Sequence, residues 1–155
     1  MAFLPLAQTV VTDWDGDAET CCLEYDARFV RRKTLVTDTG KRFLVDLAKT
    51  TSLNAGDILS LSDGTYVKIT AAAEPVLRVT GTNMAQLAWH IGNRHTPCQI
   101  TPEALTIRDD PVIGHMLAHL GATLTRAMQP FTPEGGAYGH GRTHGHAHGK
   151  TAHDH

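Results

Sequence analysis

Residues 76–130 read VLRVTGTNMAQLAWHIGNRHTPCQITPEALTIRDDPVIGHMLAHLGATLTRAMQP, and in this stretch strand-like and helix-like patterns alternate. Its first five residues, 76–80, predict a strand. Asn83 is then placed to cap a helix, with Gln86 three residues later as its capping-box partner. Apolar residues follow at helical spacing, and Gly92 is predicted to end the helix.

The second part of the stretch repeats the pattern. Strand-like segments lie around 98–100 and 105–107, and Asp110-Pro111 predicts a second helix with aspartate as its cap and proline in its first turn. The expected buried stripe consists of Ile113, Met116, Leu117, Leu120 and Leu124. A last short strand near 126–130 completes the order β-α-β-β-α-β, which predicts a ferredoxin-like domain with two helices on one face of a four-stranded sheet.

The preceding residues, 1–73, predict a small all-β domain. Gly40 and Gly64 supply the positive φ that tight hairpins need, and no helical stripe is present. Pro75 is expected to end the strand before it, which places a domain boundary here. The prediction is therefore an α+β chain with three parts: an all-β domain over 1–73, a ferredoxin-like domain over 74–134, and a disordered His-rich tail over 135–155.

The tail contains six of the ten histidines. They are His140, His144, His146, His148, His153 and His155. Imidazole suits Ni²⁺, Zn²⁺ and Cu²⁺ better than Mg²⁺ or Ca²⁺, and the intervening small residues let the backbone fold around an ion. An expression tag or an inert low-complexity tail is the alternative, but the histidines are separated rather than consecutive. The tail therefore predicts metal binding.

Overall composition limits the classes of partner. With 14 Lys+Arg against 16 Asp+Glu, the net charge of the 155 residues is −2, which gives no electrostatic case for nucleic acid. No apolar run is long enough to cross a bilayer, so no membrane association is expected. Three cysteines, two of them adjacent, cannot form a disulfide framework, and the expected compartment is the cytoplasm.

A second cluster, WHIGNRHTPC over 89–98, places His95 in a loop just after the first helix. Loops on a rigid scaffold often carry ligands, although an ordinary surface histidine is the alternative that spacing alone favours. One histidine cannot hold a transition metal by itself. His95 would need Cys98, His90 or its own copy from a second chain.

The motifs GNRHTP over 92–97 and PFTPEGGAYG over 130–139, followed by the His-rich end, closely resemble the urease accessory protein E family. The resemblance covers essentially the whole chain. It implies a cytoplasmic nickel metallochaperone that acts as a homodimer, in which one His95 from each subunit shares an ion at the two-fold axis. It also implies that the tail histidines collect nickel and that the β domain is a polypeptide-binding module. The implied partners are the urease accessory GTPase and apo-urease with its other accessory proteins.

The sequence departs from the family at one place. Members often have an Asp-His-Val-Leu segment at the start of the second helix, where this chain reads Asp110-Pro111-Val112-Ile113. An accessory metal site that uses that histidine is therefore absent or built from other ligands. His115 and His119 lie four residues apart on the second helix and could chelate an ion, but two solvated residues are the simpler interpretation.

Two other functions compete with the metallochaperone. A metal store without a dedicated client would need only the tail. A metal-dependent hydrolase would need ligands fixed by a rigid surrounding shell and a general base, and the glycine-rich tail offers only Asp154. No nucleophile or phosphate-loop motif is present either, so the chain is predicted not to be an enzyme.

Overall fold

The computed structural model describes residues 3–135. The chain divides into two compact units, one ending at Ala72 and one beginning at Ala73. The predicted disorder of the His-rich tail falls almost wholly outside the described residues. None of the helices within 3–135 is long and apolar enough to cross a membrane.

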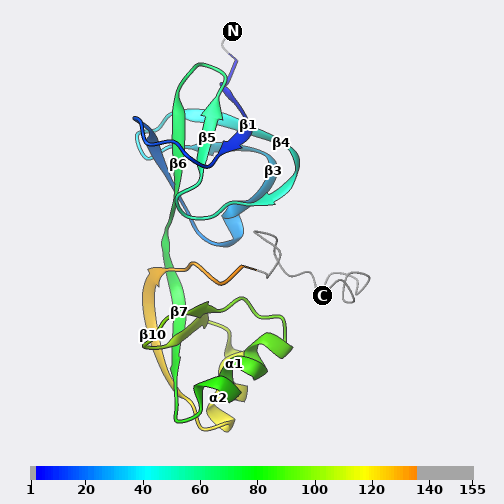
Figure 1. Ribbon diagram of the computed structural model, residues 1–155, viewed down its shortest axis with the longest axis vertical. Coiled ribbons are helices and arrows are strands. Elements are labelled where there is room, and N and C mark those ends of the chain that lie inside the picture. The colour runs from blue at the N-terminus through cyan, green and yellow to red at the C-terminus, as the bar shows by residue number, and fades with distance from the viewer. Residues whose placement is uncertain (1–2, 136–155) are drawn as a thin grey trace. The chain divides into compact units, whose positions relative to one another are not determined.

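The first unit is built from strands (Figure 1). They are β1 (Leu6–Val11), β2 (Glu19–Leu23), β3 (Phe29–Val36), β4 (Arg42–Ser52), β5 (Ile58–Leu61) and β6 (Tyr66–Ala71), with the 3₁₀ turn η1 (Asp26–Arg28) before β3. They form one sheet in the order β2-β6-β5-β1-β4-β3. Gly40 and Gly64 have φ of 98° and 87°, which confirms the predicted use of glycine at these hairpin turns. The core contains Phe43, Val45 and Ile69, each fully buried.

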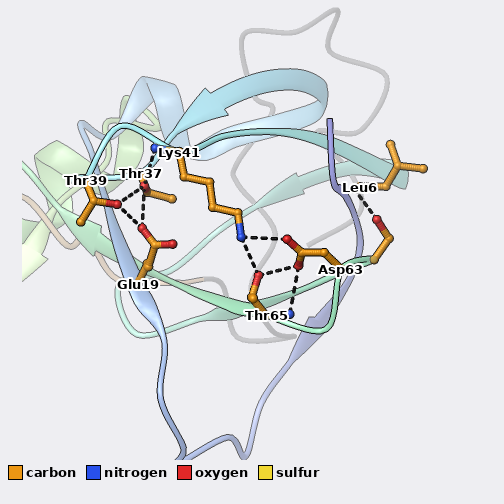
Figure 2. A network of polar contacts seen from close by, with 8 residues as sticks. Leu6, Glu19, Thr37, Thr39, Lys41, Asp63 and Thr65 are labelled. Carbon is orange, nitrogen blue, oxygen red and sulfur yellow. Dashed lines mark hydrogen bonds and ion pairs between the residues drawn. The ribbon is translucent and has the colours of Figure 1, made fainter. Parts of the chain in front are cut away.

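A polar network ties together turns of this unit that are distant in sequence (Figure 2). The Glu19 carboxylate accepts hydrogen bonds from the hydroxyls of Thr37 and Thr39. The Lys41 ammonium reaches the β5–β6 turn, where it lies 2.8 Å from the Asp63 carboxylate and donates to the Thr65 hydroxyl at 2.9 Å. The hydrogen bonds from Lys41 and Thr65 lower the pKa of the Asp63 carboxyl to about 2. Those from Thr39 and Thr37 hold the pKa of the Glu19 carboxyl below its ordinary value.

Asp63→Asn is expected to destabilise the protein at neutral pH only. Because the folded-state pKa of Asp63 is depressed, its ion pair with Lys41 contributes above about pH 4 and is lost as pH falls toward 2. The Asp63 side chain is exposed, so the free energy of unfolding at pH 7 should fall by no more than about 1 kcal/mol. Urea denaturation at pH 7 and pH 2 measures it, with Asp13→Asn as an exposed control. An equal loss at both pH values would contradict the assignment to charge.

The second unit has the predicted order β-α-β-β-α-β, and the two units together confirm the α+β class (Figure 1). Its elements are β7 (Ala73–Thr80), α1 (Met84–Asn93), β8 (Gln99–Ile100), β9 (Leu105–Arg108), α2 (Pro111–His119) and β10 (Thr123–Pro130). The strands form a sheet in the order β10-β7-β9-β8, with antiparallel pairing throughout. Alternate residues of β7 and β9 present one apolar face, and both helices pack on it. The residues of this core include Leu77, Val79, Leu87, Ile91, Leu105, Ile107, Ile113 and Leu117.

Both predicted helix caps are present. The Asn83 side chain accepts from the Gln86 N–H at 3.0 Å at the start of α1. At the start of α2, the Asp110 carboxylate accepts from the N–H groups of Val112 and Ile113 at 2.9 and 3.2 Å, and Pro111 occupies the first turn. These bonds satisfy N–H groups that have no partner inside a helix, which explains why the helices start at these residues.

The prediction that Pro75 ends a strand is wrong, because β7 already begins at Ala73 and runs through the proline. Pro75 pairs with Met128 of β10 on one side. Its carbonyl faces the other side, where it accepts from the Asp109 N–H at 3.2 Å, just beyond the end of the β9 pairing. Since the N and C=O of one residue in a strand point the same way, the missing N–H leaves the β10 ladder intact.

The predicted buried stripe of the second helix is also two residues too long, because α2 ends at His119, before Leu120 and Leu124. Ile113 and Leu117 are buried on α2, but the helix ends at His119 and Leu124 lies in β10. Leu124 packs against the same core from the sheet. Its side chain therefore matches the helical spacing by coincidence, since the chain turns at Gly121, where φ is +90°.

Candidate metal centre

The loop that carries His95 is a helix C-terminal motif with defined hydrogen bonds. The N–H of His95 donates to the Gly92 carbonyl at 3.0 Å, and the N–H of Thr96 donates to the Ile91 carbonyl at 3.3 Å. This pair of bonds is the Schellman arrangement, which usually places glycine at the residue with positive φ. The prediction that Gly92 ends the helix is therefore wrong, because α1 passes through Gly92 to Asn93 and the reversal occurs at His95.

His95 is the only residue other than glycine with positive φ among residues 3–135, at 57°. A residue with a Cβ is less stable in this left-handed backbone conformation by about 1–2 kcal/mol. Strained backbone conformations of this kind are common at functional sites, where the chemistry of the side chain is needed despite the unfavourable backbone geometry. His95 is also exposed at the surface. An imidazole therefore projects from the end of a helix at a position where the fold alone would favour glycine.

His90 and Cys98 are the two neighbouring side chains that could join His95 as metal ligands within one chain. His90 is half-buried and its ring meets the exposed Trp89 edge-on, with centroids 5.0 Å apart. Cys98 is half-buried against the core, and this burial raises the pKa of its thiol to about 11. The unbound Cys98 thiol is therefore protonated at neutral pH, and a metal ion would have to displace that proton to bind its sulfur.

Residues 131–135 return to the His95 loop, a feature that sequence reasoning missed. Phe131 is fully buried, and the Thr132 N–H donates to the Gln99 side-chain oxygen at 2.9 Å. The Glu134 N–H donates to the Cys98 carbonyl at 2.8 Å. The segment that leads into the tail is therefore attached to Cys98, which follows His95 by three residues. The sequence feature that indicates this attachment is Phe131, a large apolar residue between Pro130 and Pro133.

A second group of histidines lies around a hollow of about 480 Å³ between the helices. Its lining consists of His90, Arg94, His115, Met116, His119 and Leu120. His115 and His119 are exposed, as their position off the buried stripe predicted. Within residues 3–135, no three His, Cys, Asp or Glu side chains are already arranged to hold a metal ion. The six predicted tail ligands, His140 to His155, lie outside the described residues.

Both halves of the chain match known family models. The model described as UreE urease accessory protein, N-terminal domain, matches residues 4–72. The model described as UreE urease accessory protein, C-terminal domain, matches residues 74–155. The chain belongs to the UreE urease accessory protein family.

Individual relatives agree with this assignment over most of the chain. The UreE of Ruegeria pomeroyi is 58% identical over 135 residues, which is 87% of this chain and 91% of that protein. The UreE of Cereibacter sphaeroides is 54% identical over 152 residues, 96% of this chain and 83% of that protein. The UreE of Paracoccus denitrificans is 53% identical over 142 residues, 90% of each chain.

Membership of the UreE family fixes the broad role. UreE proteins are accessory chaperones in urease maturation and not enzymes, so the hydrolase alternative is excluded by the family match. The UreE family is associated with nickel.

Proposed function

We propose that this UreE protein is a homodimeric metallochaperone that delivers Ni²⁺ to the urease activation machinery in the cytoplasm. In this proposal one His95 from each chain binds the same ion at the two-fold axis of the dimer. The observation that supports it most strongly is the placement of an exposed imidazole at a positive-φ position, where the backbone favours glycine.

The surroundings of His95 favour transfer over permanent storage. No preassembled three-ligand group exists in the described part of the chain. An ion shared by two imidazoles would keep open positions for water or for ligands from a partner. A partner with more ligands could then withdraw the ion by exchange without first dismantling a closed site.

The tail histidines are proposed to capture nickel and to pass it to His95. The hydrogen bond from Glu134 to Cys98 fixes the start of the tail beside the His95 loop. His140 follows Glu134 by six residues, which span at most about 20 Å when extended. The same ligands would also bind Zn²⁺ or Cu²⁺. Binding requires unprotonated imidazole, so affinity should fall as pH drops through the range in which histidine titrates.

The two folded units are proposed to have separate tasks. The ferredoxin-like second unit would hold the metal and form the dimer. The strand-rich first unit resembles a polypeptide-binding module, and its sheet has two edge strands, β2 and β3, of which β2 is partly covered because Asp38 bonds to the backbone of Thr20 and Cys22. Unpaired strand edges are natural docking places for another chain. The proposed partners are the urease accessory GTPase and the complex of apo-urease with its other accessory proteins.

Urease activation at limiting nickel tests this function. The assay compares the intact protein with His95→Ala, and Asn93→Ala serves as a control because Asn93 is an exposed neighbour at the end of α1. A chaperone should lose most of its stimulation when His95 is removed, whereas Asn93→Ala should retain it. Full stimulation by His95→Ala, with unchanged nickel capacity, would instead identify a metal store.

A further inference from the structure

We propose that His115 and His119 form a second metal site for a divalent transition-metal ion, separate from His95 and from the tail. Both side chains are exposed on α2, four residues apart. Residues with this spacing lie on one face of a helix with about 5–6 Å between their Cβ atoms. Two histidines so placed can bind one ion together, as in the HxxxH spacing of helical zinc sites.

The hollow beside this pair provides room for an ion and a third imidazole. His90 of α1 lines the same hollow, opposite the α2 residues. The three rings do not converge on one point within the described structure. The exposed side chains of His115 and His119 change rotamer rapidly, however, so an ion that they bind can be brought toward the half-buried His90 without backbone movement.

Three further features of the hollow determine what it binds. Met116 and Leu120 give it an apolar side, which leaves the imidazoles as its metal-binding groups. His119 lies in the last turn of α2, where the helix dipole favours a positive charge. Arg94 is the charged residue of the lining and opposes a cation. The imidazole ligands predict a site for Ni²⁺, Cu²⁺ or Zn²⁺. Because the positive charge of Arg94 repels the ion, its affinity should be lower than that of the His95 pair.

The site deepens the proposed function and relies on it only for the identity of the cargo. Arg94 joins the two places, since it lines the hollow and immediately precedes His95 in the chain. A second, weaker ion next to the primary site would increase the amount of nickel that each chain carries to its partner.

Metal binding by a full-length background variant tests the site. In this background His95 and the six tail histidines, His140 to His155, are replaced by alanine. Equilibrium dialysis with Ni²⁺ should find one ion per chain, and the electron paramagnetic resonance spectrum of bound Cu²⁺ should show coupling to at least two imidazole nitrogens. No bound ion in this background would overturn the proposal.

Further substitutions in the same background locate the ligands. His119→Ala should weaken Ni²⁺ binding by about tenfold or more, because loss of even a supporting partner of a metal ligand costs about 10–100-fold. His119→Ala combined with Glu103→His, which restores the number of imidazoles at an exposed position elsewhere, should be equally weak. Arg94→Gln should tighten binding. Unchanged affinity after His119→Ala would overturn the proposal, and so would weaker binding after Arg94→Gln.

The outcome is separable from the test of nickel delivery. If the background variant binds its ion but intact protein fails to support urease activation, the delivery role is wrong and this site stands. If intact protein supports activation and the background variant binds nothing, the delivery role stands and this site is wrong. Circular dichroism of each variant verifies folding, which these exposed substitutions should preserve.

Discussion

Replacing His95 with glycine is expected to make the protein more stable and to remove its tight nickel site. The backbone at this residue has φ of 57°, which a residue with a Cβ adopts at a cost and glycine adopts freely. Relief of that strain should raise the free energy of unfolding by about 1 kcal/mol, or the melting temperature by about 2–4 °C for a chain of this size. Such a gain is typical of a strained functional residue, whose replacement stabilises the fold and removes the function.

The comparison with His95→Ala separates the two effects. Alanine also lacks the imidazole but keeps a Cβ at positive φ, so this variant should lose nickel binding without the gain in stability. Thermal unfolding in the presence of a chelator measures the stability of all three proteins without bound metal. A glycine variant that is less stable than the alanine variant would show that the strain argument is wrong.

Replacing all six tail histidines with alanine is expected to remove most of the nickel capacity and to leave the tight site. The intact dimer should bind more than one Ni²⁺ at neutral pH, since its two chains carry twelve tail imidazoles between them. The variant should lose the ions that the tail exchanges rapidly and keep the one that the His95 pair holds, together with the weaker ion that each chain binds at His115 and His119. Isothermal titration calorimetry of both proteins with Ni²⁺ gives the number of ions and their affinities.

The same variant should activate urease nearly normally when nickel is abundant and poorly when nickel is scarce. Capture from a dilute pool depends on the number of available ligands, whereas delivery depends on the His95 site. Replacing an equal number of exposed non-histidine residues, such as threonines, controls for the general effect of altering the surface. A tail variant that retains full nickel capacity would contradict this division of tasks.

Local chemistry explains which parts of the fold the sequence predicted. Asn83 and Asp110 cap their helices because a side-chain oxygen near a free N–H acts over a few residues, and such short-range contacts can be identified from spacing. Glycines at hairpin turns are visible for the same reason. The order of the second unit followed from alternating periodicities within one continuous stretch.

Contacts between distant residues explain what the sequence did not predict. The parallel pairing of β1 with β4 and of β2 with β6 joins segments separated by several turns, and no local pattern encodes it. Pro75 fits inside β7 only because its nitrogen faces a side where the β9 pairing has ended. The positive φ of His95 was hidden by Gly92, which satisfies the usual sequence rule for a helix end three residues too early.

The candidate site was predicted in part. His95 was identified as a loop residue after the first helix, and the structure places it there. The attachment of residues 131–135 to Gln99 and Cys98 was not foreseen, because it depends on backbone groups whose partners only the folded chain reveals. The hollow between α1 and α2 was likewise invisible until both helices were positioned.

The number of nickel ions bound per chain by His95 alone tests the account most directly. In a variant whose six tail histidines and His115 are alanine, equilibrium dialysis should find one tightly held Ni²⁺ for every two chains, and His95→Ala should abolish it. That ratio would mean that two chains share an ion through one imidazole each. One tight ion per chain, or none, would contradict the shared site on which the proposed delivery mechanism depends.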